Sequence, residues 1–182
     1  MRDRVASSRP RDVLWPRFNR AERKSIRALA ESPNWRDRLR CADWLREGET
    51  EDGNADFSLA IAGRLIFDPC PSVWARALGH IGHFCVDAPG RAWPAVEALW
   101  ATRSPTRRVC AACFILEHLL QYHFDDYFPR VKARVEAGDW KMREMLETCY
   151  RFGQAEVRSA EIDAVLAASE HLARRPAARP KP

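Results

Sequence analysis

Apolar side chains recur at intervals of three and four residues along most of the chain, the spacing that places them on one face of an α-helix. Leu39, Ala42 and Leu45 follow this spacing, for example. Helix-starting and helix-ending residues divide the pattern into nine predicted helices, which begin near residues 19, 32, 54, 69, 89, 104, 125, 139 and 157. The sequence has only 8 Gly and no alternating run rich in Val, Ile, Thr and Tyr, so we expect an all-α fold.

Side chains that can cap a helix stand at several of these starts. An N-cap side chain accepts hydrogen bonds from the first free backbone N–H groups of a helix, and Ser, Asn and Asp do this well. The predicted caps are Asn19, which has capping-box spacing to Glu22, then Asn54, either Asp125 or Asp126, and Asp139.

Three prolines indicate a repeating unit. Pro33, Pro69 and Pro105 are spaced by 36 and 36 residues, and Asp139 lies 34 residues further on. We expect each of these positions to start the second helix of a pair. A period of about 35 residues with two helices per unit is typical of an α-solenoid, because one pair cannot bury its own apolar face whereas stacked pairs share a continuous core.

Two of these starts carry a fuller motif. Asp68-Pro69-x-x-x-Val73 and Ser104-Pro105-x-x-Arg108-Val109 resemble the beginning of the second helix in HEAT-like repeats, although Trp74 and Cys110 stand where that family usually has Arg. The resemblance covers residues 20–153 as about four divergent repeats. It implies a short right-handed α-solenoid of stacked antiparallel helix pairs. HEAT-like folds include scaffolds, inhibitors, carriers and a few DNA-repair enzymes, so the resemblance implies a fold more than a function.

Charge is distributed unevenly along the chain. The net charge is +5, but residues 1–27 carry +6, residues 172–182 carry +4, and residues 28–171 carry −5. We therefore expect a flexible basic arm at 1–17, a helical repeat domain at 18–171 and a flexible basic Pro/Arg tail at 172–182. No apolar stretch is long enough to span a membrane, and no signal peptide is apparent, so we expect a cytoplasmic protein whose 6 Cys are reduced.

In HEAT-like stacks the second helices line the concave face, so their polar stripes are the natural binding surface. These stripes mix acidic with basic residues, whereas a nucleic-acid groove would be mostly Lys and Arg. Arg76, His80 and His83 are the candidates on the 69–85 helix. Gly79 and Gly82 lie in the same helix, where glycine is unfavourable. We expect a neighbouring helix, or alternatively the backbone of a partner, to approach there closely.

Metal binding and catalysis have weaker support in the sequence. His80 and His83 share a helix face and could be joined by Cys110 and Cys113 as zinc ligands. The two cysteines stand among apolar neighbours, however, where small buried side chains are expected in any case. We predict no metal and no cofactor. The sequence contains no Gly-rich phosphate loop, GxSxG or HExxH motif, so no catalytic residue is assigned.

Two acidic segments are candidates for binding a basic partner. One is the predicted loop at 47–56, which has five acids, no base and two glycines. The other is an aromatic and acidic turn. The candidate partner-binding residues of these segments are Glu49, Glu51 and Asp52 in the loop, and Tyr122, Phe124, Asp125, Asp126 and Tyr127 at the turn.

The sequence therefore favours a non-enzymatic, HEAT-like protein-binding module of a bacterial type. Within that class it favours an inhibitor or immunity-type protein that neutralises a basic protein, with a small adaptor as the next choice. The alternative is a nucleic-acid-binding or DNA-repair protein that resembles HEAT-like alkylpurine glycosylases. In that alternative Trp74, Trp140 and Asp43 would occupy the active site, and the basic ends would contact the nucleic acid.

Overall fold

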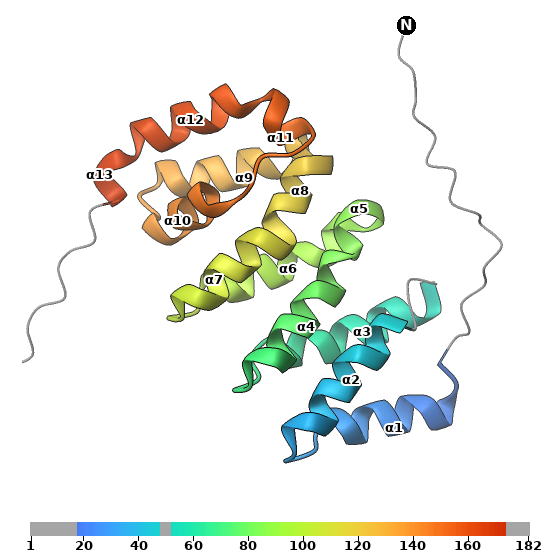
Figure 1. Ribbon diagram of the computed structural model, residues 1–182. Helices are drawn as coiled ribbons and strands as arrows, with labels where there is room; N and C mark the ends of the chain where they lie inside the picture. The colour runs from blue at the N-terminus through green and yellow to red at the C-terminus, as the bar shows by residue number, and fades with distance from the viewer. Residues whose placement is uncertain (1–17, 48–51, 174–182) are drawn as a thin grey trace, which may run out of the picture.

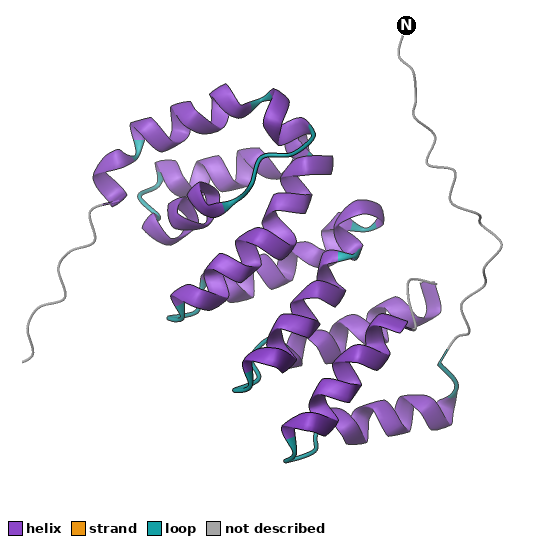
Figure 2. Ribbon diagram, viewed as in Figure 1, coloured by secondary structure: helices purple, strands orange, loops and turns teal. Residues whose placement is uncertain are grey.

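The computed structural model describes residues 18–47 and 52–173, and all regular structure in these ranges is helical (Figure 2). The predicted all-α fold is confirmed. The helices are α1 (Arg20–Ala30), α2 (Trp35–Glu47), α3 (Asp52–Leu65), α4 (Pro71–Gly82), α5 (Phe84–Asp87), α6 (Pro89–Trp100), α7 (Pro105–Ala111), the π-helical turn η1 (Ala112–Leu116), α8 (Glu117–Tyr122), α9 (Phe124–Glu136), α10 (Trp140–Thr148), α11 (Gln154–Val157), α12 (Ser159–Ala168) and α13 (Glu170–Ala173). None of the helices in these ranges has the length and apolar character needed to cross a membrane.

Most of these helices are arranged in pairs that follow one another along the molecule (Figure 1). Helix α1 packs on α2, α3 on α4, α6 on the α7–η1–α8 segment, and α9 on α10, while α12 contacts both α9 and α10. The second members contact each other in chain order, α2 with α4, α4 with η1, and η1 with α10. We call α2, α4, α7–η1–α8 and α10 the second-helix layer, and α1, α3, α6 and α9 the first-helix layer.

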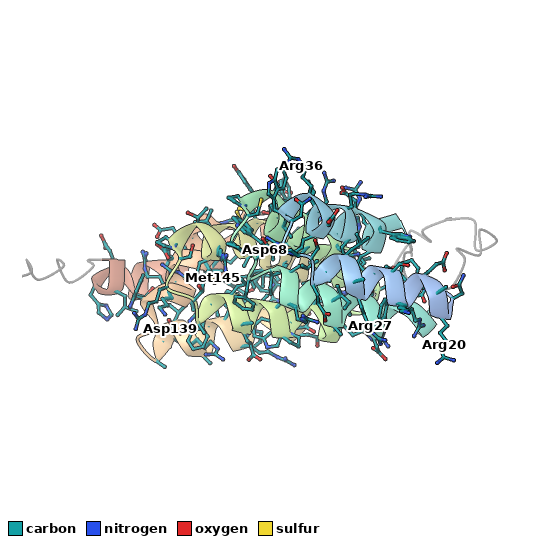
Figure 3. The ribbon with its side chains drawn as sticks, turned by 90° about the horizontal axis from the view of Figure 1, so that it is seen from below. Arg20, Arg27, Arg36, Asp68, Asp139 and Met145 are labelled. Atoms are coloured by element: carbon teal, nitrogen blue, oxygen red, sulfur yellow. The ribbon has the colours of Figure 1, made fainter. Side chains whose placement is uncertain are left out.

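The apolar core lies between these two layers. Viewed from below, Arg36 projects outward on one side of the molecule, and Arg20 and Arg27 lie on the other side (Figure 3). Small side chains at the seventh residue of α2, α4 and α7 are fully buried. These residues are Cys41, Ala77 and Ala111. Small residues here let the helices approach closely, which increases the packing contacts of the larger core residues.

Local chemistry explains where the second helices begin. Pro33 and Pro69 lie two residues before the first residues of α2 and α4, and Pro105 is the first residue of α7. The predicted proline-marked starts are thus confirmed, since proline suits the first helical position and the residues just before it, where its missing N–H costs no helical hydrogen bond. Two of the predicted caps are also present. Asn19 forms a complete capping box with Glu22, and the Asp139 carboxylate accepts from two backbone N–H groups of α10.

Two other predicted caps are wrong, in both cases because of contacts made by distant parts of the chain. Asn54 lies inside α3, where its buried side-chain oxygen accepts a hydrogen bond from the Phe18 N–H at 3.1 Å. Asp125 and Asp126 lie in the first turn of α9, not before it. That helix begins at Phe124, whose N–H donates to the side-chain oxygen of Gln154 at 3.1 Å.

Candidate binding surface on the second helices

The fourth residue of each second helix has a structural role. These residues are Arg38 in α2, Trp74 in α4, Arg108 in α7 and Arg143 in α10. Nη1 of Arg38 donates to the carbonyl oxygen of Ser32 at 2.7 Å, and Nη1 of Arg108 donates to that of Thr102 at 3.0 Å. In both cases the carbonyl belongs to the residue six positions earlier. Each guanidinium therefore holds the turn that precedes its own helix.

The same two arginines also connect one helix pair to the next. Arg38 bonds both carboxylate oxygens of Asp68, the residue three positions before α4, at 2.5 and 3.2 Å. Arg108 bonds Glu144 of α10 through Nε and Nη2 at 2.8 and 2.6 Å. Burial alone would raise the pKa of Asp68, but the hydrogen bonds from Arg38 and from the Cys70 N–H outweigh it and lower that pKa. These ion pairs belong to the framework of the fold.

A groove lies on the exposed side of α2 and α4, next to η1. It has a volume of about 510 Å³. Its lining residues are Leu39 and Arg46 from α2, Ser72, Ala75, Arg76 and Gly79 from α4, His83 at the end of α4, and Phe114 from η1. The groove thus combines an apolar surface with cationic side chains, the mixture typical of binding sites on proteins.

The cations beside the groove are more available than those in the framework. Arg40 and Arg46 are exposed, and the described part of the chain provides no salt bridge to either guanidinium. Arg76 pairs with Asp43 at 2.9 Å, and both side chains remain more than 40% exposed. Exposed pairs of this kind contribute about 0–1 kcal/mol, so a partner can replace them at little cost.

Where the groove meets η1, the backbone is unusually close. A Cβ atom at Gly82 would lie 2.5 Å from the carbonyl oxygen of Phe114, so only glycine fits without movement. This confirms the expected close approach of a neighbouring helix at Gly82. Gly79 differs, because no atom of the described residues lies within 4 Å of the corresponding Cβ position. The Phe114 side chain is 41% exposed and faces the groove.

Of the three candidates predicted on the 69–85 helix, only two lie on this surface. Arg76 and His83 are exposed and line the groove. His80 is fully buried, and its ring packs edge-on against Phe84, so its predicted place in the exposed stripe is wrong. Neither ring nitrogen of His80 has a hydrogen-bond partner among the described residues. Burial, and then the nearby His83, lower the pKa of His80 from 6.5 to about 4.

The predicted aromatic and acidic turn is only partly exposed. Tyr122, Asp125 and Asp126 lie at the surface, whereas Phe124 and Tyr127 are buried and belong to the core. Asp125 forms an ion pair with Arg158, so its charge is partly neutralised within the chain.

The other predicted acidic segment lies at the edge of what the structure covers. Glu49 and Glu51 lie outside the described residues, and Asp52 begins α3 with its side chain outside the description. The described residues therefore include no side chain of the predicted acidic loop site.

The remaining candidate sites are not assembled. Among the described residues, no three His, Cys, Asp or Glu side chains are placed to hold a metal ion. His80 points into the core while His83 is exposed, and Cys110 and Cys113 are partly buried. Each member of the predicted glycosylase-like trio contacts an arginine: Trp74 lies beneath Arg107, Trp140 beneath Arg108, and Asp43 pairs with Arg76.

Sequence reasoning missed the groove residues Leu39, Arg46 and Phe114, and the paired arginines. Arg38 lies five residues after Pro33 whereas Arg108 lies three residues after Pro105, so their common place as the fourth residue of a second helix appears only once the helix starts are known. An exposed aromatic pair was missed as well, in which the rings of Tyr150 and Phe152 stack at 6.1 Å.

No family model, no curated protein and no solved structure among those compared matches the chain.

Proposed function

We propose that this chain is a non-enzymatic protein-binding module that docks its partner on the second-helix layer. The observation that carries the proposal is the groove of about 510 Å³, in which apolar side chains lie beside exposed arginines. Protein interfaces combine an apolar centre with a polar rim, and they are enriched in aromatic residues and Arg. Phe114, Arg46 and Arg76 supply these features on neighbouring helices.

The carboxylates of this layer support binding over acid–base chemistry. Glu144 is bonded to Arg108, Glu147 to Arg143, and Asp43 to Arg76. In each of these carboxylates one oxygen bonds a guanidinium, so each already has a structural role in this layer. The Glu144 pair connects α7 with α10 and the Asp43 pair connects α2 with α4, so both support the arrangement of helices that presents the groove.

The resemblance to HEAT-like repeats remains a prediction, and it agrees with this proposal because such repeats often carry binding surfaces. An inhibitor or immunity-type role, or an adaptor role, fits the same surface. The proposed basic partner depends mainly on Glu49 and Glu51, which lie outside the described residues. The described groove has the opposite charge, which leads to the more specific proposal below.

Position-specific photo-crosslinking tests the proposal. A photoreactive benzoylphenylalanine replaces Phe114 on the second-helix layer or, as the matched control, exposed Ala60 on the first-helix layer. Irradiation in extract of the source cells should give a discrete protein adduct with the first variant and none with the second. Adducts that disappear on nuclease treatment, or equal adducts at both positions, would contradict it.

A further inference from the structure

The groove is elongated along α4. Its α4 lining runs from Ser72 through Ala75, Arg76 and Gly79 to His83, which is one continuous helical stripe. At a rise of about 1.5 Å per residue, this stripe is about 16 Å long. A groove of that length between helices accommodates about three turns of another helix better than it does a compact small molecule.

The floor of the groove allows close approach. Leu39 and Ala75 present aliphatic surface, and Phe114 presents an exposed ring. Gly79 contributes no side chain at all, and no described atom fills the space where its Cβ would lie. Glycine is among the weakest helix formers. At Gly82 the Phe114 carbonyl oxygen leaves no room for a side chain, but at Gly79 no described atom lies close enough to require glycine. A partner helix packed against α4 supplies the reason for glycine at this position.

The rim of the groove sets the charge of the partner. Arg46 and Arg76 line the groove, and Arg40 is exposed beside Leu39 on α2. Among the side chains that the structure describes on α2 and α4, the exposed or half-exposed acids are Asp37 and Asp43; the side chain of Glu47, at the end of α2, lies outside the description. Asp37 accepts a hydrogen bond from Ser32, and Asp43 pairs with Arg76. The surface is therefore cationic, and carboxylates complement it.

We infer that this groove binds an acidic amphipathic α-helix of a partner protein, and this inference rests on the proposed function. Apolar residues of the partner contact Leu39, Ala75, Gly79 and Phe114. Its flanking carboxylates pair with Arg46 and with Arg76, which exchanges its intramolecular pair with Asp43 for an intermolecular one. A nucleic acid is less suitable, because apart from the Phe114 ring the floor is formed by aliphatic side chains and glycine, which offer little stacking surface to bases.

Fluorescence anisotropy with defined peptides tests this inference on the full chain. The probe is a labelled helical peptide of about 18 residues, with Leu at positions i, i+3, i+4 and i+7 and Glu at most others, because shorter helices are marginal in water. A second peptide has Lys in place of every Glu. We expect the Glu peptide to bind, with an affinity that falls as salt rises, and the Lys peptide to bind at least tenfold more weakly.

Matched variants locate the site. Arg46→Glu and Gly79→Leu should each weaken binding of the Glu peptide at least tenfold while the melting curve stays cooperative. Their controls are Arg64→Glu and Ala60→Leu, which make the same changes at exposed positions of α3 and should change affinity less than twofold. Arg64 is 60% exposed and pairs only with exposed Glu31 among the described residues.

Several outcomes overturn the inference. Equal or tighter binding of the Lys peptide would indicate a basic partner, and tighter binding of a labelled oligonucleotide with the same dependence on Arg46 would indicate nucleic acid. Binding that is insensitive to both Arg46→Glu and Gly79→Leu would place the site elsewhere. If the Phe114 crosslink forms but the Glu peptide does not bind, the inference fails while the proposed function stands; if neither occurs, both fail.

Discussion

The two halves of the second-helix layer use their arginines differently. On α2, Arg40 and Arg46 are exposed, and no salt bridge to either is present in the described ranges. On α7 and α10, Arg108 and Arg143 are buried, and each is bonded to a glutamate of α10. Besides the framework pair of Arg38 with Asp68, the first half therefore presents exposed arginine charge to solvent, whereas in the second half Arg108 uses its charge to connect α7 with α10.

This difference shows why the number of charges in a helix does not identify a binding face. In the sequence, the polar stripes of the second helices mix acidic with basic residues in most of the repeats. In the folded chain, acids of the second-helix layer such as Asp43, Glu144 and Glu147 form ion pairs with arginines. The net charge that a partner meets therefore differs from one part of the layer to another. A buried charge has to be paired, whereas an exposed one is solvated and remains available.

The largest expected effect comes from breaking a framework arginine. Arg108→Met removes the hydrogen bonds to Glu144 and to the Thr102 carbonyl, and should lower the free energy of unfolding by about 3 kcal/mol. The matched change Arg46→Met, at an exposed position with no salt bridge to the described residues, should alter it by less than about 0.5 kcal/mol. Urea unfolding of both variants checks this. Equal effects would remove the distinction between the two halves.

Local chemistry allowed the sequence to predict much of the fold. Prolines at the starts of α2, α4 and α7, and caps such as Asn19 and Asp139, act within a few residues, so their effects are visible in the sequence. The start of α9 was misplaced, because the residue that receives its first N–H, Gln154, is 30 positions away from Phe124. Contacts of that range are set by tertiary packing.

The burial of His80 could have been predicted, whereas the groove could not. Val73, Ala77, Ile81 and Phe84 mark the inner side of this segment, and position 80 lies three after Ala77 and four before Phe84. A stricter use of the helical period places His80 inside. The groove needs Phe114 from η1 beside α4, and that neighbour depends on how the pairs stack.

His80 allows the core side of α4 to be compared with its groove side. It is buried in the core, whereas other residues of the same helix line the groove. Its pKa of about 4 lies below the ordinary 6.5, so on acidification the unfolded chain takes up the proton first. Stability should therefore fall as pH drops from about 6.5 to about 4, and level off below that. Between about pH 7 and about pH 5 the expected loss is about 2 kcal/mol.

Two substitutions separate His80 from other acid effects. His80→Leu should remove this pH dependence. It should also stabilise the protein at neutral pH, because it removes two buried nitrogens that have no hydrogen-bond partner in the described part of the chain. His171→Leu, at an exposed position in α13, should leave the pH dependence unchanged. Denaturant unfolding at both pH values measures these differences. A wild-type-like pH dependence in His80→Leu would show that another group is responsible.

The smallest expected effects come from the two glycines of α4, where the groove side and the packed side of one helix are compared directly. Gly82→Ala places a Cβ 2.5 Å from the Phe114 carbonyl oxygen, so backbone has to move, and we expect a loss of about 1–2 kcal/mol. Gly79→Ala meets no described atom within 4 Å and restricts the unfolded chain, so it should stabilise by about 0.5–1 kcal/mol. Thermal and urea unfolding of the two single variants check the opposite signs. A destabilised Gly79→Ala would mean that α4 is already covered at this position, and the groove would then not be open to a partner helix.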